Sequence, residues 1–191
     1  EQYGAKLGQM GIDVKAKQIL TSGEATAMCL SRLSPPGTRV YVIGENGIRV
    51  ALQKRGFVLA NDADVSYVVC GLDRQLTYEK LTLASMAIRS GAKFVATNPD
   101  RTLPTEQGLL PGAKAIFSAI QVATDTEPTV IGKPEPAMLE LARVDAERAG
   151  VGSRVRFIQA DATDTAVTVS FGAEGEKTFL ASLVVDKLTP Q

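Results

Sequence analysis

Short apolar runs alternate with longer amphipathic stretches along most of the chain. The apolar runs predict buried strands at residues 39–43, 65–70, 93–96, 129–131 and 154–158. The amphipathic stretches predict helices at residues 21–33, 47–54, 77–89, 111–123 and 136–149. Strands that alternate with helices are typical of parallel sheets with crossover connections. The pattern therefore predicts the α/β fold class, with parallel sheets and crossover helices.

The clearest helix start lies at Thr21, which Glu24 follows three residues later. This spacing is that of a capping box, in which the hydroxyl of the first residue accepts a hydrogen bond from the backbone of the fourth. The helix that it opens should end near Leu33, because Pro35, Pro36 and Gly37 follow.

Polar or small residues follow three of the predicted strands, as Gly44-Glu45, Gly71-Leu72-Asp73 and Thr97-Asn98-Pro99-Asp100. Open α/β sheets bind their ligands at the carboxyl ends of the strands. Asn98 and Asp100 could therefore bond a substrate, although both also suit a turn before Pro104. The sequence GENG at 44–47 lacks the spacing of either glycine-rich nucleotide motif, so we do not predict a nucleotide site there.

Lys133 follows the apolar strand at 129–131 and a single glycine. Pro134 and Pro136 come next and suit the start of a helix, because proline loses nothing at that position. A lysine at the carboxyl end of a strand is placed to bind an anion such as a phosphate. The alternative is an ordinary exposed lysine on a strand-to-helix turn.

Composition narrows the classes of function. The chain has 191 residues, a formal net charge of zero, no histidine and two cysteines. The balanced charge gives no reason to expect nucleic acid or a membrane surface as a partner. Without histidine, Ser-His-Asp catalysis and the common zinc sites are excluded. Cys29 and Cys70 lie in apolar contexts, so we expect reduced core thiols in a cytoplasmic protein.

Three motifs in order make the chain recognisable: FVATNPD at 94–100, LPTEQGLLPG at 103–112 and IGKPEP at 131–136. Together they resemble the haloacid dehalogenase superfamily, and more narrowly the NagD or nitrophenylphosphatase type with a large α/β cap. The resemblance implies that residues 1–126 are mainly the cap, with residues 1–20 approaching the core. Residues 127–191 would then form part of a Rossmann-like core.

The resemblance also implies a mechanism. Relatives hydrolyse phosphate monoesters through an aspartyl-phosphate, with a second aspartate as general acid and base and with Mg²⁺ as cofactor. Lys133 falls on the catalytic lysine that neutralises the phosphoryl group. Thr97, Asn98 and Asp100 are the candidate substrate-binding residues, and Asp161 and Asp164 fall on metal-binding positions. The implied partner is a small phosphorylated metabolite, and homo-oligomerisation is left open because caps of this family often pair.

The chain departs from the family pattern at two places. The nucleophile motif Asp-x-Asp-Gly does not occur in the 191 residues. Asp62 and Asp64 have its spacing, but they precede a strand and are interpreted as a turn. Around Asp161, Ala160 and Ala166 replace the expected glycine and last aspartate. We therefore expect a fragment or variant that has no turnover by itself.

Two alternatives remain at the level of sequence. Residues 146–161 are similar to the middle of a Rossmann-type methyltransferase, which would bind S-adenosylmethionine, so an engineered chimera would explain both resemblances. The chain could instead be a non-catalytic binding or assembly module.

Overall fold

The computed structural model describes residues 20–132. The helix predicted at 136–149, the strand predicted at 154–158 and the segment similar to methyltransferases lie outside the described residues. None of the helices within 20–132 is long and apolar enough to cross a membrane.

A five-stranded parallel sheet forms the centre of the described domain. Its strand order is β2-β1-β3-β4-β7, and every pairing in it is parallel. The strands are β1 (Arg39–Ile43), β2 (Val58–Leu59), β3 (Tyr67–Cys70), β4 (Lys93–Ala96) and β7 (Thr129–Val130). The predicted fold class is therefore confirmed for this part of the chain.

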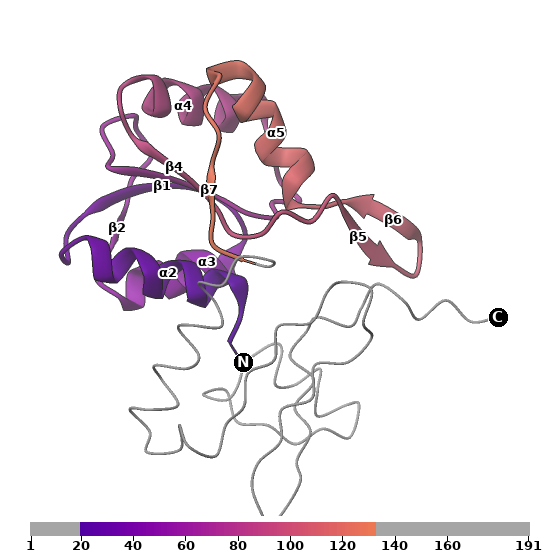
Figure 1. The fold of residues 1–191 in the computed structure, drawn as a ribbon, viewed down its shortest axis with the longest axis horizontal. Coiled ribbons are helices and arrows are strands. Elements are labelled where there is room, and N and C mark those ends of the chain that lie inside the picture. The colour runs from indigo at the N-terminus through magenta and orange to yellow at the C-terminus, as the bar shows by residue number, and fades with distance from the viewer. Residues whose placement is uncertain (1–19, 133–191) are drawn as a thin grey trace, which may run out of the picture.

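Two helices cover each face of the sheet (Figure 1). On one face lie α2 (Ser22–Leu33) and α3 (Asn46–Lys54), and on the other lie α4 (Tyr78–Arg89) and α5 (Ala113–Thr124). Strand residues alternate between the faces, so Val40 and Val42 pack in the first apolar layer while Tyr41 and Ile43 pack in the second. Burial on both faces explains why these strands read as continuous apolar runs.

The helix starts follow from local chemistry. The Thr21 hydroxyl accepts a hydrogen bond of 3.1 Å from the Glu24 backbone N–H, as the sequence predicts. Thr77 caps α4 in the same way, through Lys80 N–H at 3.3 Å. The turn predicted at 62–64 is also present, since Asp62 Oδ1 accepts a hydrogen bond from Asp64 N–H at 3.1 Å.

An antiparallel hairpin extends from the sheet domain (Figure 1). It consists of β5 (Thr102–Thr105) and β6 (Gly108–Pro111), joined by the two residues Glu106 and Gln107. The sequence pattern does not predict this hairpin, and the helix predicted from residue 111 begins instead at Ala113. Pro104 and Pro111 weaken the strand signal, but both are tolerated because a two-stranded ribbon consists only of edges.

Strand β7 pairs with β4 within the five-stranded sheet. The predicted division at residue 126 assigned this strand to the second unit, whereas the sheet includes it and extends to Val130. The division of the whole chain into a cap and a partial core stays a prediction.

The sheet has a topological switch between β1 and β3. From β1 the chain passes through α3 to β2 on one side, and it then returns to β3 on the other side of β1. Helix α3 leaves β1 over one face of the sheet and α4 leaves β3 over the other (Figure 1). The loops after β1 and β3 therefore diverge, and such a switch point leaves a crevice at the carboxyl ends of the strands.

Candidate functional site

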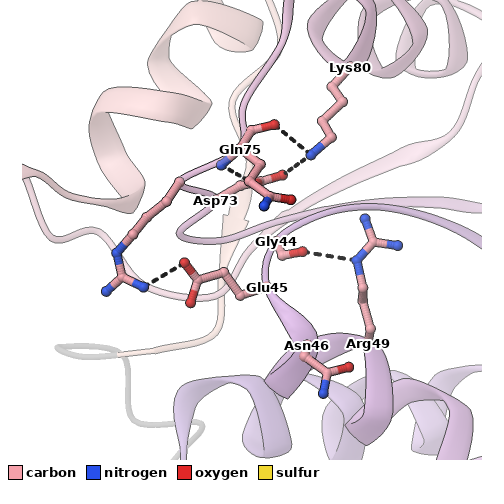
Figure 2. A pocket seen from close by; sticks show the side chains of 8 residues that line it. Gly44, Glu45, Asn46, Arg49, Asp73, Gln75 and Lys80 are labelled. Carbon is pink, nitrogen blue, oxygen red and sulfur yellow. Dashed lines mark hydrogen bonds and ion pairs between the residues drawn. The ribbon is translucent and has the colours of Figure 1, made fainter.

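An open pocket of about 600 Å³ lies at this switch point. The loop after β1, the start of α3, the loop after β3 and the first turn of α4 surround it, as Figure 2 shows. Its lining residues are Gly44, Glu45, Asn46, Arg49, Asp73, Arg74, Gln75 and Lys80. The lining is thus dominated by charged and amide side chains.

A buried ion pair fixes the loop after β3. Lys80 Nζ lies 2.7 Å from Asp73 Oδ2, and the Asp73 side chain is only 4% exposed. Asp73 Oδ1 accepts a hydrogen bond from Gln75 N–H at 2.9 Å, and Lys80 also donates to the Gln75 carbonyl at 2.8 Å. Both carboxylate oxygens therefore have partners, as a buried charge requires. The pair ties the loop to α4.

A second ion pair joins the two loops across the pocket. Arg74 Nη1 lies 2.7 Å from Glu45 Oε1, and both side chains are largely exposed. Solvent screens such a pair, so its contribution to stability is small. Its effect is to connect the loop after β1 to the loop after β3 at the rim of the pocket.

The side chain of Arg49 bonds two backbone carbonyls at the end of β1 that the short strand β2 does not reach. Strand β2 pairs with β1 only at Arg39 and Val40, so it ends before the later carbonyls of β1. Arg49 Nη2 donates to the Val42 carbonyl at 2.8 Å, and Arg49 Nε donates to the Gly44 carbonyl at 3.0 Å. The guanidinium thereby satisfies acceptors that a longer β2 would have bonded.

The charges near this pocket affect the pKa of Tyr41 on β1. Burial raises the pKa of its phenol, the positive charge of Arg49 opposes that rise, and the negative charge of Asp73 adds to it. The phenol is therefore neutral at physiological pH.

A second polar group follows β4, where substrate-binding residues were predicted. The buried Thr97 hydroxyl donates to Asn98 Oδ1 at 2.8 Å, and Asn98 Nδ2 donates to Asp100 Oδ2 at 2.6 Å. Thr97 also lies against Gly71, where a Cβ would come within 2.8 Å of Thr97 Oγ1. The structure thus brings Thr97, Asn98 and Asp100 together, and their role in binding substrate stays a prediction.

Gly132 packs directly against this second group. A Cβ at Gly132 would overlap the Thr97 carbonyl oxygen and crowd Asn98. The next residue in the chain is Lys133, which lies outside the described residues, as do Asp161 and Asp164. Within residues 20–132 no three His, Cys, Asp or Glu side chains are placed to hold a metal ion.

Most of the charged pocket is not predicted by the sequence pattern. Glu45 and Asp73 stand out because they follow predicted strands, but the pattern does not link them to Arg49, Arg74 or Lys80. A usable signal existed, because Arg49, Arg74 and Lys80 all lie within ten residues of a predicted strand end. Which of them reach the same crevice depends on the strand order, and the sequence does not give that order.

Comparison with known proteins identifies the relatives of this chain. A family model described as haloacid dehalogenase-like hydrolase matches residues 1–58. The acid sugar phosphatase of Staphylococcus aureus strain USA300 is 49% identical over 139 residues, which are 73% of this chain and 53% of that protein. The chain belongs to the haloacid dehalogenase superfamily. It spans about half the length of the curated relatives that it matches.

Solved structures of this superfamily match in fold as well as in sequence. A putative p-nitrophenyl phosphatase from Bacillus subtilis is 40% identical with a TM-score of 0.71, over 75% of this chain and 55% of that chain. A glycerol phosphate phosphatase from Mycobacterium tuberculosis, solved in complex with magnesium, is 33% identical with a TM-score of 0.73, over 76% of this chain and 45% of that chain. These are phosphatases of the type that the sequence motifs predict.

Proposed function

We propose that the described residues 20–132 belong mainly to the cap of a magnesium-dependent phosphatase, which hydrolyses phosphate monoesters of small metabolites. The observation that carries this proposal is the 49% identity to an acid sugar phosphatase over 139 residues. The shared fold with a p-nitrophenyl phosphatase and a glycerol phosphate phosphatase supports it. In this proposal the carboxyl ends of the cap strands face the reaction site.

The predicted residues have distinct roles in this proposal. Lys133 holds the phosphoryl group as a fixed cation, and the hydrogen-bonded residues Thr97, Asn98 and Asp100 orient the substrate next to it. Asp161 and Asp164 are the predicted magnesium ligands, and carboxylate oxygens are the donors that this ion prefers. A bound Mg²⁺ supplies charge that stabilises the transferring phosphoryl group.

The 191 residues by themselves are proposed to be inactive, because they contain no Asp-x-Asp-Gly motif to supply the nucleophile. The test is hydrolysis of p-nitrophenyl phosphate and glycerol phosphate by the purified chain with Mg²⁺. We expect no turnover above the buffer rate. Robust turnover that Lys133→Ala or Asp161→Ala abolishes would contradict this part of the proposal.

The cap role needs a separate test, because an inactive chain cannot show it. Residues 20–132 replace the matching segment of the B. subtilis p-nitrophenyl phosphatase, and the hybrid is assayed with the same two substrates. Magnesium-dependent turnover with an altered substrate preference is expected. A folded hybrid that has lost all hydrolysis argues against the cap role.

One observation favours a second candidate function, that of an assembly module. The hairpin of β5 and β6 exposes Leu109, of which 72% is accessible. Caps that pair with a second subunit could cover such a side chain. Light scattering on the purified chain decides this point: a homodimer that Leu109→Asp dissociates supports assembly, and a strict monomer removes it.

A further inference from the structure

We propose that the pocket at the switch point, lined by Arg49, Lys80 and Asn46, binds one anionic group of a small molecule, a carboxylate or a phosphate. The main contact of the bound group is the guanidinium of Arg49. Where the anion belongs to the phosphatase substrate, the proposal rests on the function proposed above, and it then names a second binding subsite for that substrate.

The first argument is topological. The pocket lies between the loops that follow β1 and β3, which are the two strands where the chain changes direction across the sheet. In open α/β sheets this crevice is the preferred place for a ligand, because the two crossover helices leave over opposite faces. The position of the pocket thus follows from the strand order, independently of its charge.

The second argument is the balance of charge in the lining. Of the described residues, three cationic side chains and two carboxylates line the pocket. Asp73 is neutralised by Lys80 and Glu45 by Arg74. Arg49 forms no ion pair with any described carboxylate, since both of its hydrogen bonds go to neutral carbonyls. The lining therefore carries one positive charge that no carboxylate of residues 20–132 compensates.

The third argument is the geometry of the guanidinium. Arginine has five N–H donors, and the two carbonyl bonds of Arg49 engage one donor on Nε and one on Nη2. The remaining donors lie on the two terminal nitrogens, which suit two-point binding of a carboxylate or phosphate. The carbonyl bonds also hold the guanidinium in place, so little side-chain entropy is lost when an anion binds.

The other lining groups fit a small polar molecule better than an aromatic one. The amides of Asn46 and Gln75 offer neutral donors and acceptors, and none of the residues from 20 to 132 that line the pocket is aromatic. Figure 2 shows Arg49, Asn46 and the ion pair of Asp73 with Lys80 around the same opening. A compact molecule with hydroxyl groups and one terminal anion matches this lining.

The experiment is a titration of the ¹⁵N-labelled 191-residue chain with inorganic phosphate and, separately, with malonate, followed by amide NMR shifts. Saturable shifts confined to the backbone of residues 44–49 and 73–75 are expected, with affinity in the millimolar range. The absence of saturable shifts, or saturable shifts only elsewhere, would overturn the proposal.

Variants of Arg49 test whether its positive charge binds the anion. Arg49→Gln should weaken binding by roughly tenfold, the effect of losing one charge-assisted hydrogen bond. Arg49→Lys keeps a cation and should lose less, which provides a second test if Arg49→Gln fails to fold. The matched control is Arg89→Gln. The guanidinium of Arg89 donates a hydrogen bond to the Ala123 carbonyl, and Arg89 is not among the lining residues of the pocket. Equal weakening by Arg49→Gln and Arg89→Gln would contradict the assignment.

Two further titrations distinguish a free anion from the end of a substrate. Glycerol 3-phosphate and 3-phosphoglycerate differ by the carboxylate at the end far from the phosphate. Tighter binding of 3-phosphoglycerate, lost in Arg49→Gln, supports a substrate subsite, whereas equal affinity of both esters and inorganic phosphate supports a site for a free anion. Each readout is binding without turnover, so it is independent of whether the chain is a phosphatase.

Discussion

The ammonium of Lys80 lies 2.7 Å from a carboxylate oxygen of Asp73, and the two residues come from different elements of the sheet domain. Asp73 follows β3 and Lys80 lies in the first turn of α4. The Asp73 side chain is almost completely buried, whereas 27% of the Lys80 side chain is exposed. This pair sets the shape of the loop that forms one wall of the pocket.

Lys80→Met should destabilise the domain, because it leaves the Asp73 charge buried without its partner. Removing one member of a buried ion pair costs about 3–5 kcal/mol, and the partial exposure of Lys80 lowers our expectation to about 2 kcal/mol. Urea unfolding measures the change. The control Lys54→Met removes an exposed lysine without a described partner, and an equal loss in both variants would contradict the prediction.

Arg49→Met should also destabilise the domain, since the carbonyls of Val42 and Gly44 lose their donor. Unsatisfied buried acceptors cost about 1–3 kcal/mol, and access of water to the pocket places the expected loss near 1 kcal/mol. Thermal unfolding of Arg49→Met and Arg49→Lys tests this. Lysine can reach one carbonyl, so Arg49→Lys should fall between the wild type and Arg49→Met.

Thr21→Ala should weaken the start of α2. The threonine hydroxyl accepts a hydrogen bond from the Glu24 backbone N–H, and loss of such a cap typically costs about 1 kcal/mol. Thr21→Ser keeps an acceptor at the same place and should remain close to the wild type. The free energy of unfolding in urea distinguishes the two, and a neutral Thr21→Ala would show that the cap contributes little.

Two glycines should respond to alanine in opposite ways. Gly132→Ala places a methyl group against the Thr97 carbonyl, so we expect a loss of about 2–3 kcal/mol from forced displacement of the backbone. Gly47 lies in the first turn of α3 with open space around it, and Gly47→Ala should stabilise by about 0.5 kcal/mol. Differential scanning calorimetry compares the two, and equal effects would contradict the close approach at Gly132.

Cys70 should not react with thiol reagents in the folded chain. Burial raises the pKa of its thiol from 9.0 to about 12, so almost no thiolate forms near neutral pH. In the variant Cys29→Ala, labelling of Cys70 by a disulfide reagent should be limited by unfolding and should accelerate with urea. Rapid labelling without denaturant would contradict the described burial.

The same thiol makes stability depend on alkaline pH. Because the folded pKa exceeds the unfolded value of 9.0, the contribution of Cys70 is complete below that pH and is lost as the pH rises toward about 12. Urea unfolding of the wild type and Cys70→Ala at mildly alkaline pH isolates this effect. The difference in stability between the two should shrink as the pH rises.

The sequence predicts the elements that local signals define. Strands β1 and β4 have the predicted bounds because both are buried on both faces and read as uninterrupted apolar runs. Helix α2 follows the cap predicted at Thr21, and α4 has the predicted extent because its amphipathic period is long enough to read. Strand β2 was missed since it contains only Val58 and Leu59, too few residues to show any period.

The pocket could not be predicted because it depends on contacts between distant residues. Glu45 and Arg74 are 29 positions apart, and only the strand order brings their loops together. Arg49 presented a different difficulty, because an arginine in the first half of an amphipathic helix reads as part of a solvated face. Its role becomes visible only when β2 is seen to end opposite Val40, before it reaches Val42.

The shortness of β2 has a consequence for the behaviour of the chain in solution. Backbone acceptors left open beside a strand are a template on which a strand of another molecule can add, which is how ordered aggregates grow. At Val42 and Gly44 the guanidinium of Arg49 occupies those acceptors. A charged side chain bonded at this position leaves these two acceptors without room for an incoming strand, which is one of the devices by which natural sheets keep an edge from pairing with another chain.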